Sequence, residues 1–390
     1  MSAPRKVRIL AAAGARPNFV KIAPLVERLD AQPGAETLLV HTGQHYDFSL
    51  SASFFEQLQI RTADIHLETG SGSHGRQTGE ILARFEPVAR DWKPDVVLVV
   101  GDVNSTLACA LAAVKLHVPV AHVEAGLRSF DRTMPEEINR VLTDSISAFL
   151  FVSEPSGVEN LRREGVADER IHLVGNVMID SLRKFLPVAK KSETVRQLGL
   201  SLAAGAAGGS QPFALVTMHR PSNVDEKNDL KRLLGVLAEI GGRVPVIFPA
   251  HPRTQERIRS FGLGADAHLC EDMRDVRAAE KGLWLTPPMG YLEFLHLMSE
   301  AELVLTDSGG IQEETTALGV PCLTLRDNTE RPITVSEGTN QVVGSDPQKI
   351  LRAAEEILAG GGKKGRVPAL WDGKAAGRIV QVLLESGAAR

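Results

Sequence analysis

Residues 95–102 read Asp95-Val96-Val97-Leu98-Val99-Val100-Gly101-Asp102, an apolar run that ends in a glycine and a carboxylate. Apolar, β-branched runs without polar alternation are typical of strands buried on both faces of a parallel sheet. Amphipathic stretches typical of helices separate this run from its neighbours, so the first half predicts a doubly wound α/β domain. The remaining expected strands are 7–13, 37–41, 119–123, 149–152 and 171–174, and the expected helices are 19–29, 75–90, 105–116 and 136–146.

The same rhythm returns in the second half of the chain. The alternation of strands and helices stops after Asn176 and is absent through the small-residue tract 202–209, which can pack little against a core. The expected strands then lie at 213–218, 244–249, 283–286, 303–306 and 321–325, with helices at 229–240, 291–301 and 312–318. We therefore predict an α/β fold of two Rossmann-like, doubly wound parallel-sheet domains, joined near residues 177–212. Ligands of such sheets collect beyond the carboxyl ends of the strands, in this case in a central cleft that the two domains face.

Composition excludes several classes of partner. The chain has 390 residues, 44 Lys+Arg against 48 Asp+Glu, and 5% aromatic residues, which is enough for two domains with cores of their own. The near-neutral balance and the few aromatic rings argue against nucleic acid as a ligand. Three separated cysteines in apolar surroundings, Cys109, Cys270 and Cys322, favour buried thiols and the reducing cytoplasm over disulfides. No apolar run approaches the ~20 residues of a membrane span, so we expect neither membrane nor targeting segment.

Cations follow the first predicted strand. The loop Gly14-Ala15-Arg16-Pro17-Asn18 lacks the G-x-G-x-x-G pattern of dinucleotide-binding domains. Arg16 and Lys21 instead stand at a helix opening, where an anionic ligand would also meet the positive end of the helix dipole. Ordinary solvated surface charges explain the pair equally well.

Carboxylates follow the next two long strands. Asp102 ends one strand, and Glu124 lies in His122-Val123-Glu124-Ala125-Gly126-Leu127-Arg128 at the end of the second. Asp102 would also serve as an ordinary cap of the following helix. Glu124 is harder to explain, since a charge at the end of a buried strand needs a partner or a task. Glu136 adds a third acid in Pro135-Glu136-Glu137, although acids are also favoured there by helix electrostatics.

The second half carries a more specific loop. Thr306-Asp307-Ser308-Gly309-Gly310-Ile311-Gln312-Glu313-Glu314 places glycines between a strand and a helix, where backbone N–H groups can approach a diphosphate closely. Glu314, one turn into that helix, suits a ribose hydroxyl. His219, beside Arg220 at another strand end, is either a ligand contact or proton donor, or a satisfied core histidine. Taken alone, the glycines would also fit a tight turn.

Taken together, the motifs give a resemblance along nearly the whole chain. The sequence resembles the non-hydrolysing UDP-N-acetylglucosamine 2-epimerases, which have the two-domain fold of B-type glycosyltransferases (GT-B). The motifs that carry the resemblance are Gly14-Ala15-Arg16-Pro17, His41-Thr42-Gly43-Gln44-His45, Gly101-Asp102, residues 122–128, Pro135-Glu136-Glu137, Asn139-Arg140, Val174-Gly175-Asn176, His219-Arg220, residues 306–314 and Thr329-Glu330-Arg331-Pro332.

The resemblance implies a reaction and a division of the chain. It implies that UDP is eliminated from UDP-N-acetylglucosamine and added back to a glycal, with no cofactor and no metal, giving UDP-N-acetylmannosamine for surface polysaccharide synthesis. It implies domains at residues 1–176 and 177–372, a helix within 373–390 that crosses back to the first domain, and a homodimer. Residues that match the family's catalytic groups are Asp102, Glu124, Glu136 and His219; those that match its substrate contacts are Arg16, Lys21, Met289, Phe294, Ser308, Gly309, Gly310, Glu314 and Arg331.

Some positions depart from the family's common pattern. Pro221-Ser222-Asn223 follows His219-Arg220 where many members carry another polar residue and Glu-Asn, and Ile333 stands where many have Glu. These departures leave open a related sugar, such as UDP-2,3-diacetamido-glucuronic acid. The same motifs would also fit a GT-B glycosyltransferase, a hydrolysing epimerase or a catalytically silent nucleotide-sugar sensor. The clustered acids favour the epimerase over the glycosyltransferase, and the presence of Asp102, Glu124, Glu136 and His219 argues against the sensor. The sequence leaves the hydrolysing epimerase open, and product analysis separates it.

Overall fold

We describe a computed structural model of the chain, which covers residues 5–43, 61–200, 211–277 and 280–387. The chain divides into two compact units: unit 1 is Met1–Arg183 with Ala369–Arg390, and unit 2 is Lys184–Pro368. The sequence places these divisions at 176/177 and 372/373 instead. The first division falls inside helix α7 (Val177–Ala189), whose Ser181 Oγ donates to the Val20 carbonyl of unit 1 at 2.5 Å. Gln44 and His45 of the second motif, and the tract 202–209, lie outside the described residues.

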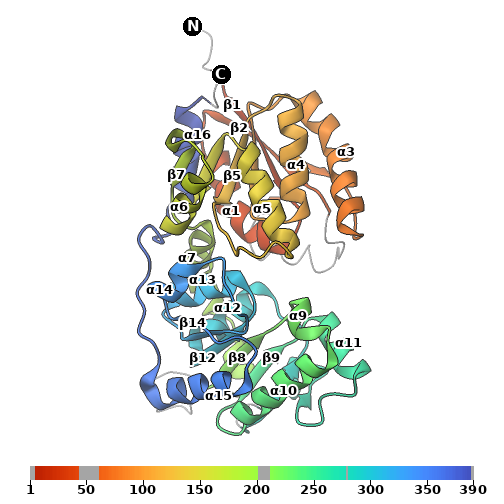
Figure 1. Ribbon diagram of the computed structural model, residues 1–390, viewed down its shortest axis with the longest axis vertical. Coiled ribbons are helices and arrows are strands. Elements are labelled where there is room, and N and C mark those ends of the chain that lie inside the picture. Colours follow the sequence, from red (N-terminus) through yellow and green to blue (C-terminus); the bar gives the residue numbers. More distant parts are fainter. Residues whose placement is uncertain (1–4, 44–60, 201–210, 278–279, 388–390) are drawn as a thin grey trace. The chain divides into compact units, whose positions relative to one another are not determined.

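Unit 1 is built on a seven-stranded parallel sheet with the strand order β3-β2-β1-β4-β5-β6-β7. Figure 1 shows α3, α4 and α5 side by side along one face of this sheet, and α16 packs against α1. Its elements are β1 (Val7–Ala13), α1 (Arg16–Asp30), β2 (Ala35–His41), β3 (Ile65–His66), α3 (His74–Trp92), β4 (Val96–Val100), α4 (Asn104–Lys115), β5 (Val120–Ala125), α5 (Pro135–Ile146), β6 (Phe149–Val152), α6 (Pro155–Arg163), β7 (Ile171–Leu173), the first part of α7, and α16 (Ala375–Glu385).

The strands of unit 1 are buried on both faces of the sheet, as is usual for parallel sheets covered by helices. Leu10 and Ala12 of β1 pack into one core with Phe85 of α3 and Cys109 of α4. Because side chains alternate along a strand, the equally buried Ile9 points to the opposite face. The strand order reverses between β1 and β4, and this switch point is where the loops after the two strands separate and leave room for a ligand.

Unit 2 repeats the plan with a second seven-stranded parallel sheet, in the order β10-β11-β9-β8-β12-β13-β14. Its switch point lies between β8 and β12. Its elements are α8 (Thr194–Gln197), β8 (Ala214–Thr217), α9 (Pro221–Val224), α10 (Lys227–Gly241), β9 (Val246–Pro249), α11 (Pro252–Ser260), β10 (His268–Leu269), β11 (Leu283–Thr286), α12 (Tyr291–Glu300), β12 (Leu303–Thr306), α13 (Gly309–Leu318), β13 (Cys322–Thr324), α14 (Pro332–Ser336), β14 (Asn340–Val342) and α15 (Pro347–Glu356).

The predicted fold class is therefore confirmed: each unit is an α/β domain on a parallel sheet. The prediction for the cysteines is wrong in one position. Cys109 and Cys322 are buried, but Cys270 is only half-buried because it follows β10, a short strand at the sheet's edge. No helix in the part of the chain that the structure describes is long and apolar enough to cross a bilayer.

Candidate active site

Asp102 lies directly beyond the carboxyl end of β4, at the switch point of unit 1. Its Oδ2 accepts two hydrogen bonds from Arg140 of α5, from Nε at 3.0 Å and from Nη2 at 2.8 Å. Asp102 is not the cap of the next helix, since α4 has Val103 as its N-cap. The interpretation of Asp102 as a cap is therefore wrong. The Asp102 side chain remains 22% exposed, so the carboxylate is held firmly while still open to a ligand.

Glu124 lies on the neighbouring strand in an unusual backbone conformation. Its φ is +71°, a left-handed value that is costly for a non-glycine residue, and the register of β5 against β6 shifts between Val123 and Ala125. Backbone strain of this kind, ~1–3 kcal/mol, clusters at functional sites. The buried carboxylate forms an ion pair with Lys21 of α1, which is also buried. The bulge thus turns Glu124 toward the cation that compensates its charge.

Glu136 and its neighbour Glu137 begin α5 with Pro135 at the first helical position, as the sequence predicts. They differ in their surroundings. Glu137 is buried: its Oε2 accepts from the Ser129 N–H at 2.9 Å, its Oε1 from the Phe130 N–H at 2.9 Å, and Arg140 Nη1 donates to Oε2 at 2.6 Å. Glu136 is half-buried. Glu137 therefore shapes the preceding loop, which leaves Glu136 as the first-turn carboxylate suited to contact a ligand.

The glycine-rich loop of unit 2 forms the N-terminus of α13, as the motif predicts. Ser308 is the N-cap, and its side chain makes no capping hydrogen bond. The Arg331 guanidinium lies against Gly309, where a Cβ would come within 2.4 Å of Nη1. Arg331 Nε also pairs with the buried Glu313 at 2.7 Å. Backbone N–H groups, the positive end of the helix dipole and a guanidinium thus meet at one place, which suits a phosphate.

A hollow of about 260 Å³ adjoins this helix terminus. It lies at the carboxyl ends of the strands, since Thr217 ends β8 and Ser308 follows β12. His219, Met289 and Phe294 also line it, so the structure brings these three predicted residues together with Ser308. The remaining lining residues are Met218, Pro249, His251, Pro288 and Ile311.

Asp307 orients His219 within this hollow. The Asp307 carboxylate is fully buried and accepts the His219 N–H at 3.0 Å, the Arg220 N–H at 2.9 Å and the Asn223 amide at 3.0 Å. His219 Nδ1 lies 3.3 Å from Asp307 Oδ1, while the histidine side chain stays 52% exposed. His219 is thus no core histidine: one ring edge faces a carboxylate, and the side chain remains accessible to a ligand.

Glu314 is buried one turn into α13, and the Tyr291 hydroxyl donates to its Oε1 at 2.8 Å. Burial raises the pKa of Glu314 to about 7; the hydrogen bond from Tyr291 lowers it, and the neighbouring charge of Glu313 raises it further. Near neutral pH this carboxyl group is therefore balanced between its two protonation states.

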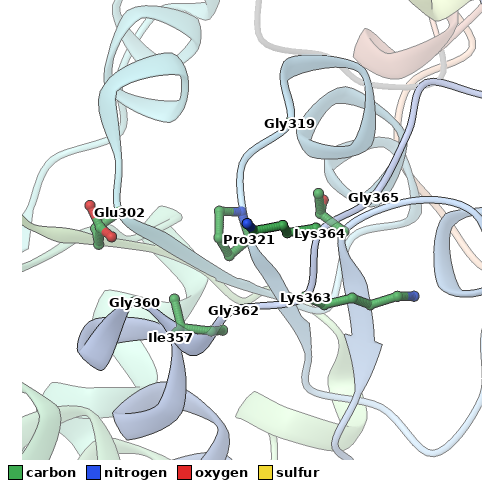
Figure 2. A pocket seen from close by; sticks show the side chains of 10 residues that line it. Glu302, Gly319, Pro321, Ile357, Gly360, Gly362, Lys363, Lys364 and Gly365 are labelled. Carbon is green, nitrogen blue, oxygen red and sulfur yellow. The ribbon is translucent and has the colours of Figure 1, made fainter.

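A second hollow in unit 2, of about 400 Å³, lies at the opposite ends of the strands. Glu302, Pro321 and Thr339 line it, and each immediately precedes a strand. Figure 2 shows its two lysines, Lys363 and Lys364, extending in opposite directions. Lys363 Nζ donates to the carbonyls of Val335 and Asn340 and so supports the backbone. This hollow lies apart from the glycine-rich loop, and we assign the candidate site to the carboxyl ends.

The structure shows which side chains hold the predicted site residues in place, and the sequence alone does not identify these partners as functional. Lys21, expected at a diphosphate, pairs with Glu124, and the side chain of Arg16 lies outside what the structure describes. Arg140, Asp307 and Tyr291 each orient a predicted site residue. Arg140 and Asp307 stand within conspicuous motifs, which is a usable signal, whereas Tyr291 carries none. No group of three or more metal-ligating side chains is found among the described residues.

The fold and the site together define a class of protein. Parallel α/β units with acids at the switch point of one and a glycine-led helix terminus at the switch point of the second are typical of enzymes that act on nucleotide-linked substrates. The sequence pattern of the UDP-N-acetylglucosamine 2-epimerase family matches residues 27–384. The chain belongs to the UDP-N-acetylglucosamine 2-epimerase family, whose members are isomerases.

Relatives and solved structures agree with this assignment. The chain is 43% identical over 373 residues to UDP-N-acetylglucosamine 2-epimerase of Methanocaldococcus jannaschii, covering 95% of this chain and 97% of the relative. A solved structure of the M. jannaschii enzyme in complex with UDP-GlcNAc and UDP has a TM-score of 0.83 at 41% identity, covering 97% of this chain and 100% of that one. The chain is also 41% identical over 355 residues, 90% of this chain and 92% of the relative, to UDP-2,3-diacetamido-2,3-dideoxy-D-glucuronate 2-epimerase of Pseudomonas aeruginosa.

Proposed function

We propose that this protein interconverts UDP-N-acetylglucosamine and UDP-N-acetylmannosamine by inverting C2 of the sugar. The observation that carries the proposal is the pair of carboxylates at adjacent strand ends of unit 1, each held by its own cation: Asp102 by Arg140 and Glu124 by Lys21. A reaction that removes and returns a proton at one carbon needs two such groups. The M. jannaschii relative, 43% identical over nearly the whole chain, carries the name of this activity.

In the proposed reaction, UDP leaves and then returns. A carboxylate removes the C2 proton, the C–H electron pair forms the C1–C2 double bond, and the C1–O bond breaks with its electrons going to UDP. The resulting glycal accepts a proton at the opposite face of C2, and the phosphate oxygen of UDP adds again to C1. Atoms and electrons balance without an oxidant. Asp102, Glu124 and Glu136 are the groups we assign to these proton transfers.

Unit 2 is proposed to hold the nucleotide. The α13 N-terminus with Ser308, Gly309 and Gly310 would receive the diphosphate, Arg331 would neutralise it, and Glu314 would accept from the ribose. Met289 and Phe294 would border the uracil, and His219 would approach the phosphate that leaves. Because the C2 proton is weakly acidic, acid–base groups worth about 10² to 10⁴ each need strong stabilisation of the leaving diphosphate. Preorganised dipoles and cations of this kind are its usual source.

Solvent deuterium exchange tests this function directly. Wild-type protein in D₂O should place deuterium at C2 of UDP-N-acetylglucosamine and form UDP-N-acetylmannosamine, and Asp102→Asn and Glu124→Gln should each reduce the exchange rate by at least about 10³. Asp168→Asn removes a carboxylate from an exposed ion pair with Arg162 in the same unit and should leave the rate unchanged. Absence of exchange in the wild type with any UDP-N-acetylhexosamine would refute the proposal.

A second candidate substrate is a UDP-2,3-diacetamido-glucuronic acid, because the P. aeruginosa relative of that specificity is 41% identical over 90% of this chain. Running the exchange with both nucleotides separates the two: faster exchange into the diacetamido sugar assigns that substrate and keeps the reaction class. Free N-acetylmannosamine or a glycosylated acceptor among the products would instead indicate the hydrolysing epimerase or a glycosyltransferase. We further propose that the product serves surface polysaccharide synthesis and that the enzyme is a homodimer.

A further inference from the structure

His122 lies inside unit 1 on β5, the strand that carries Glu124, and its side chain reaches the turn after β4 that carries Asp102. The side chain is completely buried on β5, two residues before Glu124. Its Nδ1 lies 2.7 Å from Asp144 Oδ1, and its Nε2 lies 2.7 Å from the carbonyl oxygen of Gly101, the residue before Asp102. Both ring nitrogens therefore face oxygen atoms at short hydrogen-bond distance.

The hydrogen-bond partners of this ring constrain its protons. A carbonyl oxygen only accepts, so Nε2 must carry a proton to bond Gly101. Asp144 is the second acceptor, and its Oδ2 already accepts the Gly126 N–H at 3.0 Å and pairs with Arg128 Nη1 at 2.7 Å. Asp144 is therefore ionised independently of the ring, because the buried guanidinium of Arg128 and the Gly126 N–H both stabilise its negative charge. An ionised Asp144 can only accept from Nδ1.

The charges around the ring are consistent with a second ring proton. Arg128 bridges Asp144 to Glu164, whose Oε2 lies 2.7 Å from Nη2. These are one cation and two carboxylates, all but Glu164 almost fully buried. A charged His122 makes the four groups neutral together, with the exposed Glu164 pairing from the surface with the guanidinium that also holds Asp144.

We propose that Asp144 holds His122 as a buried imidazolium, and that this imidazolium is a positioning residue for Asp102 and Glu124. Through Nε2 it fixes the Gly101 carbonyl, and Gly101 has the left-handed φ of +69° that starts the Asp102 turn. Through its place on β5 it sets a permanent positive charge behind the strained Glu124. The catalytic consequence rests on the proposed function; the protonation state does not.

Further charged groups also face this region. Lys21 from α1 pairs with Glu124, Arg140 from α5 pairs with Asp102, and Arg128 with Glu164 closes the network from the β5–α5 loop and the end of α6. A test therefore has to change the charge on His122 while leaving these pairs in place.

Asp144→Asn meets that requirement. The asparagine oxygen can still accept from Gly126 and Arg128, and its amide can donate to a neutral Nδ1, so every hydrogen bond is kept. One negative and one positive charge disappear together, which leaves the network's net charge unchanged. Glu164→Gln is the matched control, because it removes the second carboxylate of Arg128 but not the partner of His122.

The experiment reads the ring directly by ¹⁵N NMR of histidine-labelled full-length protein, with the His122 signals assigned through His122→Gln. In wild type, His122 should show two ring N–H protons near neutral pH, whereas His41 and His172 should be neutral there, since burial lowers the pKa of both. Asp144→Asn should reduce His122 to one N–H, and Glu164→Gln should not. A single ring N–H on His122 in wild type overturns the proposal.

The same proteins test the catalytic consequence. Asp144→Asn should lower kcat for C2 exchange about 10-fold or more with KM changed less than about 2-fold, as expected for a lost charge that acts on the reacting groups. Glu164→Gln should match wild type. An unchanged kcat in Asp144→Asn with a neutral His122 would overturn the positioning role. If wild type itself shows no exchange, the proposed function fails. The NMR experiment still tests the protonation state of His122 independently of that outcome.

Discussion

Arg140 holds two carboxylates at once, Asp102 through Nε and Nη2 and Glu137 through Nη1. A lysine would keep the charge but cannot supply this planar fork of donors. We expect Arg140→Lys to lower kcat about 10²-fold with little change in KM, because displacement of a catalytic group by ~1 Å costs about that much. Steady-state deuterium exchange measures both constants.

Arg163→Lys is the matched comparison for this prediction. Arg163 belongs to an exposed i,i+4 pair with Glu159 on α6, where the fork geometry contributes little. The substitution Arg163→Lys should therefore leave kcat and the melting temperature unchanged. If Arg140→Lys also keeps kcat within about 2-fold of wild type, Asp102 does not depend on Arg140 for its placement.

Glu314 gives unit 2 a pH dependence whose sign can be worked out. Its pKa is raised from the ordinary 4.5 to about 7 by burial. Between these values the folded protein holds a proton that the unfolded chain has lost, so Glu314's contribution to stability falls as pH rises through about 7. Glu314→Gln removes this dependence. The unfolding free energy of the variant, relative to that of wild type, should therefore rise between about pH 5 and about pH 8, by on the order of 3 kcal/mol at most. Melting temperatures measured across this pH range would show the change. A stability difference between Glu314→Gln and wild type that stays constant over this pH range would contradict the raised pKa. Glu355→Gln is the control, because Glu355 belongs to an exposed ion pair with Arg243 and its substitution should give such a constant difference.

At the scale of elements, the N-terminus of α13 depends on the absence of a side chain at Gly309. A Cβ there would come within 2.4 Å of Arg331 Nη1, so alanine must displace the guanidinium. Gly309→Ala should therefore weaken UDP binding about 10-fold or more, measured by calorimetry, because both the approach to the backbone N–H groups and the cation are disturbed.

Gly235 offers a control in another helix of the same unit. It lies within α10, and nothing stands within 4 Å of the place a Cβ would occupy. Gly235→Ala should raise stability by ~0.5–1 kcal/mol, through helix propensity, and leave UDP affinity unchanged. Equal affinities in Gly309→Ala and Gly235→Ala would exclude the proposed phosphate contact at α13.

The elements differ in how well the sequence predicts them, and length explains most of the difference. β1, β6, β11 and β12 agree with their predicted bounds because each is a continuous apolar run. The two-residue β3 and β10 are edge strands that are too short to show a pattern. The helix α7 is not predicted because the pause after Asn176 resembles a linker, although Val177, Leu182 and Phe185 are buried on it.

At the scale of the whole molecule, the candidate site is predictable in part because strand ends are visible in sequence. Asp102, Glu124 and Ser308 can be found since each directly follows or ends an apolar run. Their partners come from elsewhere: Lys21 lies 103 residues from Glu124, and Arg140 lies 38 residues from Asp102. Such pairings depend on the packing of helices onto strands, which a single sequence does not reveal. The +71° φ of Glu124 is likewise a result of sheet register.

After unit 2 the chain continues back into unit 1, and three contacts hold residues 370–376 against the rest of unit 1. Trp371 is fully buried, and its Nε1 donates to the Ser153 carbonyl at 3.1 Å. The carbonyl oxygen of Leu370 lies so close to Gly175 that a Cβ there would come within 2.1 Å, which explains the glycine of Val174-Gly175-Asn176. Asp180 accepts the first N–H groups of α16, from Ala375 at 3.1 Å and from Ala376 at 2.8 Å. Residues that follow unit 2 in sequence, from Leu370 to Ala376, are therefore part of the packed structure of unit 1.

This arrangement predicts that one substitution near the C-terminus destabilises the N-terminal unit alone. Trp371→Ala should cost unit 1 ~3–5 kcal/mol, because it removes a large buried side chain and leaves the Ser153 carbonyl without its donor. Hydrogen exchange should accelerate in the strands of unit 1 and in α16, while the strands of unit 2 keep their protection. Trp92→Ala, at a half-buried tryptophan that stacks on Arg8, should have a much smaller effect. Faster exchange in both units after Trp371→Ala would mean that the two units unfold together, and unchanged exchange in unit 1 would mean that the C-terminal segment adds nothing to its stability.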